Sequence, residues 1–159
     1  MAMIIREAMT QDYDALCELI DQADALHQDH LPYIFQKAKG PARDRDFILG
    51  LIEDENVGLF VAEVEGQLVG FAHVRVRDSP DIPILLPRRF AVLEGLAVRE
   101  NSRRAGIGRA LMEKVHEWAA SKGATAIELN VHEFNQGAVA FYQALGYEVS
   151  SRKMSRFLK

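Results

Sequence analysis

The chain lacks several features that would place it in particular protein classes. It has a single cysteine, Cys17, so no intrachain disulfide forms. No apolar run approaches the roughly 18 residues of a membrane-spanning helix, and the first residues lack the apolar core of a signal peptide. Basic residues are not in excess, because 19 basic and 23 acidic side chains leave a net charge of −4. We therefore expect a cytoplasmic protein that does not span a membrane and is not a general nucleic-acid binder.

What remains is the composition of an ordinary globular protein. The chain has 159 residues, of which 48% are hydrophobic and 26% charged. This length fits one domain that buries most of its apolar surface without a disulfide or a metal. We expect a single domain over residues 1–159, with no repeat or linker, and Cys17 as a small buried core residue.

The hydrophobic pattern predicts alternating strands and helices. A first helix is expected after Thr10, which is placed to cap it. The strands are expected at 3–6, 59–64, 68–76, 90–98, 126–131 and 147–154, and the later helices at 44–54, 108–121 and 136–144. Hairpin-linked strands followed by strand–helix–strand units predict an α/β fold with a mixed sheet flanked by helices.

A basic, glycine-bearing turn lies between the strand expected at 90–98 and the helix expected at 108–121. Gly106 and Gly108 allow a tight turn whose N–H groups face outward, and the helix adds its unpaired amides and its positive dipole end. The spacing matches neither a P-loop nor the dinucleotide fingerprint, whose third glycine position holds Leu111. The turn is therefore either a diphosphate site or a plain surface connection. Arginines favour the first reading, and we expect five of them near the turn: Arg88, Arg89, Arg103, Arg104 and Arg109.

The pattern Arg103-x-x-Gly106-x-Gly108 resembles a signature of the GNAT superfamily of acyl-CoA-dependent N-acetyltransferases. A second stretch, from Asn135 through Tyr142, is similar to that family's Asn-x-x-Ala-x-x-Phe-Tyr signature. The resemblance implies a GNAT-like fold, acetyl-CoA as the co-substrate and no metal. It also implies coenzyme contacts at Leu96, Ala97, Val98, Arg103, Arg104, Ala105, Gly106, Ile107, Gly108, Arg109, Asn135 and Tyr142.

The same resemblance implies two candidate catalytic residues, and the chemistry of histidine adds a third. Tyr142 is expected to protonate the departing thiolate, and Glu94 to remove the proton of the substrate ammonium. His73 is a second candidate base, because an imidazole titrates near neutral pH. Gly95, next to Glu94, indicates a β-bulge that opens the strand. Each residue also has a structural interpretation: an aromatic core for Tyr142, a solvated glutamate for Glu94 and a buried histidine for His73.

The expected function is transfer of an acetyl group from acetyl-CoA to a primary amine by direct attack in a ternary complex. The alternative is a non-catalytic CoA-binding or interaction domain. The acceptor, a small molecule or a peptide amine, is not identified by the variable segments 27–43 and 78–89. The helical spacing of His27 and His30 suits a metal, but no third ligand is apparent. The apolar run 82–86 indicates a homodimer.

Overall fold

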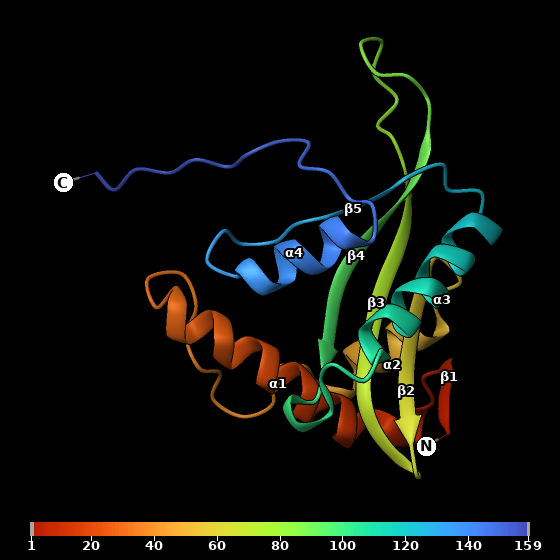
Figure 1. Ribbon diagram of the computed structural model, residues 1–159. Helices are drawn as coiled ribbons and strands as arrows, with labels where there is room; N and C mark the ends of the chain where they lie inside the picture. Colours follow the sequence, from red (N-terminus) through yellow and green to blue (C-terminus); the bar gives the residue numbers. More distant parts are fainter. Residues whose placement is uncertain (1, 159) are drawn as a thin grey trace. The chain divides into compact units, whose positions relative to one another are not determined.

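The structure, a computed structural model, describes residues 2–158. Figure 1 shows the order of the elements along the chain. They are β1 (Met3–Glu7), a 3-10 turn (Thr10–Asp12), α1 (Tyr13–His30), α2 (Arg45–Glu53), β2 (Val57–Val64), β3 (Gln67–Asp78), β4 (Arg89–Val98), a 3-10 turn (Glu100–Ser102), α3 (Ile107–Ser121), β5 (Ile127–Leu129) and α4 (Gln136–Ala144).

The chain divides into two compact units, which we describe separately. Residues up to Leu129 form the first unit and residues from Asn130 the second. The first unit holds the whole sheet, and the second holds α4. The expectation of a single domain over 1–159 stays a prediction.

The sheet is mixed, as the order of elements predicts. Its strand order is β1-β2-β3-β4-β5. The first four strands are antiparallel neighbours, and β5 runs parallel to β4. The turn between β2 and β3 is the predicted hairpin, in which Glu65 and Gly66 both have positive φ, at 52° and 79°. Short connections explain the antiparallel part, and the crossover through α3 explains the parallel pair.

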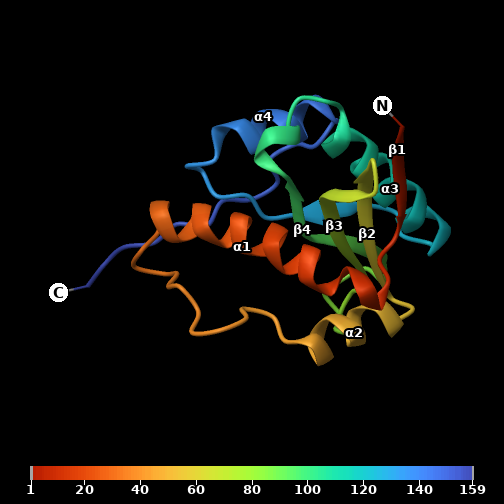
Figure 2. The same cartoon turned by 90° about the horizontal axis from the view of Figure 1, so that it is seen from below.

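Helices cover both faces of the sheet in the first unit. Figure 2 shows α1 and α2 on one side and α3 on the other. Leu16, Leu19 and Phe71 belong to the buried cluster on the α1 side. Phe60 and Leu111 are buried on the α3 side, where each fully buried side chain of this size contributes about 1.5–3 kcal/mol. Apolar residues recur every 3.6 residues in the helices and every second residue in the strands, so the buried faces could be predicted from the sequence.

Two predicted strands differ from the structure. The strand expected at 126–131 is only Ile127–Leu129, and the strand expected at 147–154 is absent, since the described residues after α4 contain no strand. A β-rich sequence adopts a strand only where a neighbour accepts its backbone hydrogen bonds. The sequence pattern predicts a tendency to form a strand. The described residues 130–131 and 147–154 pair with no strand of the sheet, which ends at β5.

The expected cap at Thr10 is also wrong. Thr10 opens a 3-10 turn, and Asp12 is the residue that precedes α1. The Asp12 carboxylate accepts hydrogen bonds from the Arg6 guanidinium, at 2.8 and 3.0 Å, and from the Met9 N–H, at 2.7 Å. The Arg6 guanidinium lowers the pKa of Asp12 below its ordinary value. The ion pair between half-buried Arg6 and buried Asp12 thus fixes the chain before α1. Cys17 of α1 is half-buried rather than fully buried as predicted.

Candidate active site

The glycine turn is an exposed loop at the end of β4. Arg104 and Gly106 lie in the left-handed region, with φ of 66° and 79°. The first helical bond of α3 runs from the Ala110 N–H to the Gly106 carbonyl, at 3.0 Å. The N–H groups of the three residues before Ala110 therefore have no carbonyl partner inside the helix, and Gly106 has no side chain to cap them. Such a turn, with a positive helix end behind it, suits an anion.

A glycine in β3 lets α3 begin this close to the sheet. A Cβ placed on Gly70 would lie 3.0 Å from the Ala97 carbonyl oxygen, 3.1 Å from Leu111 Cδ1 and 3.2 Å from Ile107 Cγ2. Any side chain there would push the first turn of α3 away from β3 and β4. Ile107 is buried, whereas its neighbours in the loop are exposed. Packing under Ile107 therefore fixes the loop while the loop backbone remains accessible.

Gln22 of α1 holds the start of the loop and was not predicted from the sequence. Its side-chain amide donates to the Val98 carbonyl at 3.0 Å, and its Oε1 accepts from the Glu100 N–H at 3.2 Å. One side chain thus bridges the last residue of β4 and the first residue of the next turn. The two partners are more than 70 residues away in sequence, and a lone glutamine on a helix gives no signal of this role.

The predicted bulge in β4 is confirmed. His73 of β3 lies opposite Gly95, but the next residue, Val74, lies opposite Leu93, so Glu94 is the extra residue. β5 pairs with β4 only up to Leu93. Beyond that point, no strand of the described chain lies on this side of β4. The bulge therefore coincides with the place where the two parallel strands part.

The opened half of β4 presents backbone donors at this free edge. The Arg99 N–H donates to the Val69 carbonyl of β3 at 2.7 Å, which fixes the alternation of the ladder. By that alternation the amides of Leu96 and Val98 point away from β3. They face the side that β5 has left, next to the loop. These are two of the residues for which a coenzyme contact is predicted.

Glu94 and His73 come together at the bulge. The Glu94 carboxylate accepts from Arg77 Nη2 at 3.2 Å, and its side chain is 33% exposed. His73 lies two residues from Phe71 and therefore on the same face of β3, the one that α1 covers. Within residues 2–158, the buried His73 Nε2 has no hydrogen-bond partner. A buried nitrogen without a partner is unusual in a core and fits a site that receives a polar ligand or water.

The surroundings of His73 keep its imidazole neutral. Burial lowers the pKa of His73, and the nearby Glu94 opposes this by raising it. The positive charges of Arg75 and Arg43 lower the pKa further. The imidazole is thus available as a proton acceptor at neutral pH, as a candidate base requires.

The second signature begins at the N-terminus of α4, in the second unit. Asn135 Oδ1 accepts from the Ala138 N–H at 3.1 Å, so its side chain caps the helix. The Tyr142 ring meets the rings of Phe141 and Tyr147 edge-on, with centroids 5.2 and 5.8 Å away. Burial, together with Tyr147, raises the pKa of Tyr142 to about 12. The phenol therefore keeps its proton throughout the physiological pH range.

The expected gathering of five arginines is wrong. Arg88 pairs with Glu128 at 2.8 Å, and Arg89 pairs with Asp78 at 3.2 Å and donates to the Lys122 carbonyl at 2.8 Å. Arg88 precedes β4 and Arg89 is its first residue, whereas the loop follows the strand, and a ten-residue strand separates the two ends by about 30 Å. The order of the chain already places Arg88 and Arg89 at the start of the strand expected at 90–98 and the loop at its end, so their grouping with the loop was an error of interpretation. Of the five, Arg103 and Arg104 lie in the loop itself and Arg109 lies in the first turn of α3.

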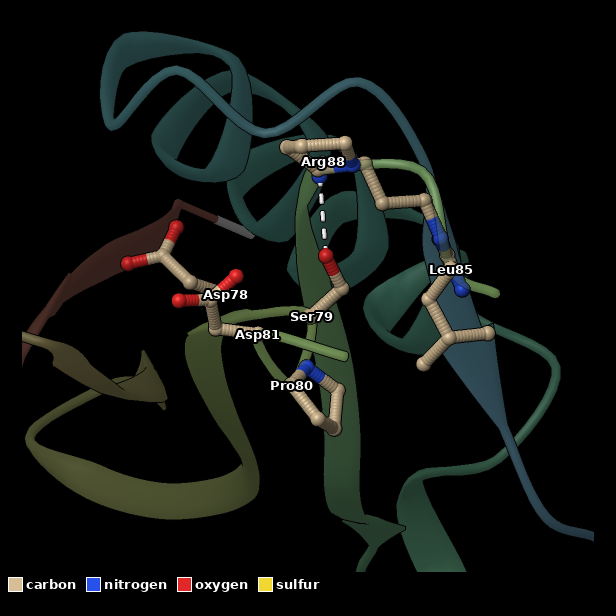
Figure 3. Close-up of a pocket in the computed structure, with 7 residues that line it drawn as sticks. Asp78, Ser79, Pro80, Asp81, Leu85 and Arg88 are labelled. Carbon is tan, nitrogen blue, oxygen red and sulfur yellow. Dashed lines mark hydrogen bonds between the residues drawn. The ribbon is translucent and has the colours of Figure 1, made fainter. Parts of the chain in front are cut away.

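The connection between β3 and β4 forms a separate hollow at that far end. Ser79 joins the two sides of this connection, because the Arg88 N–H donates to Ser79 Oγ at 2.9 Å (Figure 3) and Ser79 Oγ donates to the Leu86 carbonyl at 3.0 Å. The hollow has a volume of about 410 Å³. Its lining comprises Asp78, Ser79, Pro80, Asp81, Leu85, Pro87 and Arg88. Since Asp78 pairs with Arg89, its charge is already partly satisfied inside the first unit.

The two histidines with metal-like spacing bond within their own helix. The Nδ1 atoms of His27 and His30 lie 2.9 and 3.0 Å from the carbonyls of Ala23 and Leu26. The described part of the chain contains no group of three or more histidine, cysteine, aspartate or glutamate side chains arranged for a metal ion. Nor does any helix among residues 2–158 have the length and apolar character needed to cross a membrane.

Comparison with known proteins assigns the family. The chain matches the acetyltransferase (GNAT) family over residues 15–147, so it belongs to the GNAT family. It is 33% identical over 144 residues to the uncharacterized N-acetyltransferase MJ1207 of Methanocaldococcus jannaschii. That match covers 91% of this chain and 60% of the archaeal protein, so the chain spans less than two thirds of this relative.

Solved structures agree on the fold. A variant of the BH1408 protein from Bacillus halodurans superposes with a TM-score of 0.93 at 28% identity, covering 98% of this chain and 99% of that one. An aminoglycoside N-acetyltransferase in complex with CoA superposes with a TM-score of 0.73 at 18% identity, covering 98% and 99%. The GNAT-like fold expected from the two signatures is thus confirmed.

Proposed function

We propose that this protein is an N-acetyltransferase that moves an acetyl group from acetyl-CoA to a primary amine. The observation that carries the proposal is the exposed loop with uncapped α3 amides, placed directly after the opened half of β4. The loop and the strand edge together offer hydrogen-bond donors for two different parts of one long, anionic co-substrate. Membership of the GNAT family supports the same conclusion.

In this proposal the loop binds the diphosphate of acetyl-CoA. The backbone N–H groups from Arg103 to Arg109 supply the donors, and the three arginine side chains add positive charge. The amides of Leu96 and Val98 bind the pantetheine arm and the acyl carbonyl, with Ala97 between them turned toward the core. Asn135 and Tyr142 contribute from the second signature.

The reaction needs one base and one acid. Glu94, with His73 as the alternative base, takes the proton of the substrate ammonium, and the neutral amine attacks the thioester carbon. The developing oxyanion accepts a hydrogen bond from a β4 amide. The amine forms the C–N bond, the C–S bond of the resulting adduct then breaks, and the Tyr142 hydroxyl gives its proton to the departing thiolate. The attacking nitrogen loses its second proton, which leaves a neutral amide and restores the proton of Tyr142. A neutral phenol suits this task because its raised pKa keeps the proton available.

We propose a small-molecule or peptide amine as the acceptor, and a homodimer as the assembly. The structural neighbours include aminoglycoside acetyltransferases, which supports a small-molecule amine. Ile84 and Leu86, at the tip of the β3–β4 connection, are 86% and 83% exposed. Two such apolar side chains in the same loop favour self-association.

A thiol-release assay with acetyl-CoA and a panel of amines tests the function. We expect turnover with at least one primary amine, and a fall of at least 10-fold in kcat for Glu94→Gln, since an amide cannot accept the ammonium proton. Arg77→Gln is the matched control, because it removes the partner of Glu94 and leaves the carboxylate. If coenzyme A binds but no amine in a broad panel is acetylated, the protein is a non-catalytic CoA-binding domain.

A further inference from the structure

The end of β4 is held from two sides by other parts of the first unit. On one side, the Arg99 N–H donates to the Val69 carbonyl of β3 at 2.7 Å. On the other side lies α1, which passes beside the tip of β4 (Figure 1). Its residue Gln22 reaches the backbone at two points, the Val98 carbonyl at 3.0 Å and the Glu100 N–H at 3.2 Å. A single side chain therefore spans the junction between the strand and the turn that follows it.

The two backbone points belong to different parts of the proposed coenzyme site. Val98 is the last residue of β4, whose opened edge is proposed to bind the pantetheine arm. Glu100 begins the turn that leads into the glycine loop, which is proposed to bind the diphosphate. Gln22 thus joins the pantetheine half of the site to the diphosphate half through one amide group.

These hydrogen bonds leave the ligand-facing donor of the strand unused. By the alternation of the ladder, the N–H and the carbonyl of Val98 both point away from β3. The carbonyl accepts from Gln22 and from Arg103 Nε, the latter at 3.4 Å, so neither bond uses the Val98 N–H. An amide side chain fits this place because it donates and accepts at once, whereas an ionised carboxylate only accepts and an ammonium only donates.

We propose that Gln22 is a positioning residue that sets the spacing between the two halves of the coenzyme site, so that the protein binds the whole coenzyme in preference to either half. This proposal rests on the proposed function. A ligand that binds at two subsites gains fully from the second contact only when the subsites are already held at its own spacing. Without the Gln22 bridge each half would still meet its own donors, but the loop would be free to shift relative to the strand edge. Loss of the bridge therefore weakens binding of the whole coenzyme more than binding of its parts.

Gln22→Met tests this bridge, because methionine has a similar length, volume and helix propensity but forms neither hydrogen bond. We expect the affinity for coenzyme A to fall about 10-fold, as for the loss of a hydrogen-bonded bridge. The affinities for the two halves, 3′-phospho-ADP and pantetheine, should each fall less than about 2-fold. Calorimetry measures the first two ligands, and NMR titration measures pantetheine. A residue that only stabilises the fold would lower the melting temperature and leave the ratio of these affinities unchanged.

Gln28→Met is the matched control on the same helix. It makes the same substitution six residues farther along α1, where the side chain points about 240° around the helix from Gln22. We expect this variant to bind coenzyme A and both halves as the unaltered chain does. A loss in Gln28→Met equal to that in Gln22→Met would assign the effect to α1 as a whole and overturn the proposal.

Gln22→Glu separates the two hydrogen bonds of the bridge. A carboxylate still accepts from the Glu100 N–H but has no donor for the Val98 carbonyl. Its affinity for coenzyme A should fall at least as far as that of Gln22→Met, since one bond alone does not join the two halves. Native affinity in Gln22→Glu would show that the bond to Val98 is not needed and would overturn the bridge.

Amide exchange measured by NMR tests the bridge without any ligand. The Glu100 N–H should exchange about 10-fold faster in Gln22→Met than in the unaltered chain, because its acceptor is gone. The Arg99 N–H donates to the Val69 carbonyl and should keep its exchange rate, so it serves as the internal control. Equal exchange of the Glu100 N–H in both proteins would refute the bridge.

The outcomes for the unaltered chain and for Gln22→Met separate this proposal from the proposed function. If the unaltered chain binds no coenzyme A, the proposed function is rejected and this proposal falls with it. If the unaltered chain binds coenzyme A and Gln22→Met binds it equally well, the bridge alone is rejected. Equal losses for the whole coenzyme and for one of its halves would place Gln22 in that half of the site and overturn its role in spacing.

Discussion

Helices α3 and α4 begin in opposite ways, because a glycine, Gly106, precedes α3 and an asparagine, Asn135, precedes α4. α4 is closed by its own residue, since Asn135 Oδ1 accepts the Ala138 N–H. α3 begins at Gly106, which has a left-handed φ of 79° and no side chain to cap the helix. Closing a helix end stabilises it by about 1 kcal/mol, so an open end gives up stability that a serine or asparagine would supply.

This difference between the two helix starts suggests that α3 serves coenzyme binding and α4 serves catalysis. The open end of α3 offers backbone donors, which hold an anion without depending on any one side chain. The closed end of α4 leaves function to side chains farther along the helix, above all Tyr142 with its raised pKa. We therefore expect changes in the α3 loop to act on coenzyme affinity and changes on α4 to act on kcat.

Of the changes considered, Gly108→Trp at the start of α3 should have the largest effect on coenzyme A affinity. An indole in the first turn of α3 blocks the approach of a diphosphate to the amides, and we expect coenzyme A affinity to fall about 100-fold, or about 2.7 kcal/mol. Isothermal titration calorimetry measures this loss. Unchanged affinity would show that the loop does not bind the diphosphate.

Arg104→Ala is the control for charge in the same loop. It removes a guanidinium but keeps the main-chain donors, so we expect a loss of only about 3- to 10-fold, smaller at high salt. The substitution adds little backbone strain, because Arg104, which also has a Cβ, already adopts a positive φ of 66°. A larger loss than for Gly108→Trp would mean that side chains, not amides, dominate binding.

Tyr142→Phe tests the α4 side. Removing one hydroxyl should lower kcat by about 100-fold, the lower end of the range for a general acid, and leave coenzyme A affinity within about 2-fold. Steady-state kinetics and calorimetry on the same sample separate the two. Tyr147→Phe is the matched control, since this neighbouring tyrosine also has its pKa raised to about 12 by burial. Equal losses in both variants would indicate an aromatic cluster rather than an acid at Tyr142.

The sequence predicted the parts of the site that depend on local chemistry. The glycines at 106 and 108, the bulge beside Gly95 and the helix beginning at 136 follow from backbone preferences of single residues. The element order and the mixed sheet follow from periodicity and connection length. All of these are properties that a short stretch of chain carries by itself.

What the sequence did not predict depends on distant partners. Gln22 reaches the end of β4 from α1, and nothing in its own helix indicates this. Arg88 and Arg89, at the start of β4, pair with Glu128 and Asp78, and neither partner was predicted. The strand expected at 147–154 is absent, and the described residues of that stretch adopt no regular structure. Tertiary neighbours decided each of these outcomes, and a single sequence does not reveal them.

The next prediction concerns His73, an ionisable residue of the sheet that belongs to neither α3 nor α4. Because burial lowers its pKa, the folded state binds a proton less readily than the unfolded chain. Its stabilising contribution is therefore full above the unfolded value, near pH 6.5, and is lost as the pH falls through the folded pKa. The melting temperature of the native protein should drop more steeply below about pH 6.5 than that of His73→Gln.

The same variant tests whether His73 is the base. If His73 is also the base, His73→Gln lowers kcat about 10-fold at pH 7.5 in addition to changing the melting curve. An unchanged melting curve would contradict the burial of an unpaired imidazole nitrogen.

The smallest effect, at Asn135, sharpens the comparison between the two helix ends. Asn135→Ala removes the cap and should lower the free energy of unfolding by about 1 kcal/mol, whereas Asn135→Ser restores a capping oxygen and should stay within a few tenths of that of the native protein. If the Asn135 amide also binds the coenzyme, both variants lose about 3-fold in affinity, since neither retains an N–H donor. Denaturant unfolding measures the cap and calorimetry measures the contact. Native affinity in Asn135→Ser would restrict Asn135 to capping and leave coenzyme binding to the open end of α3.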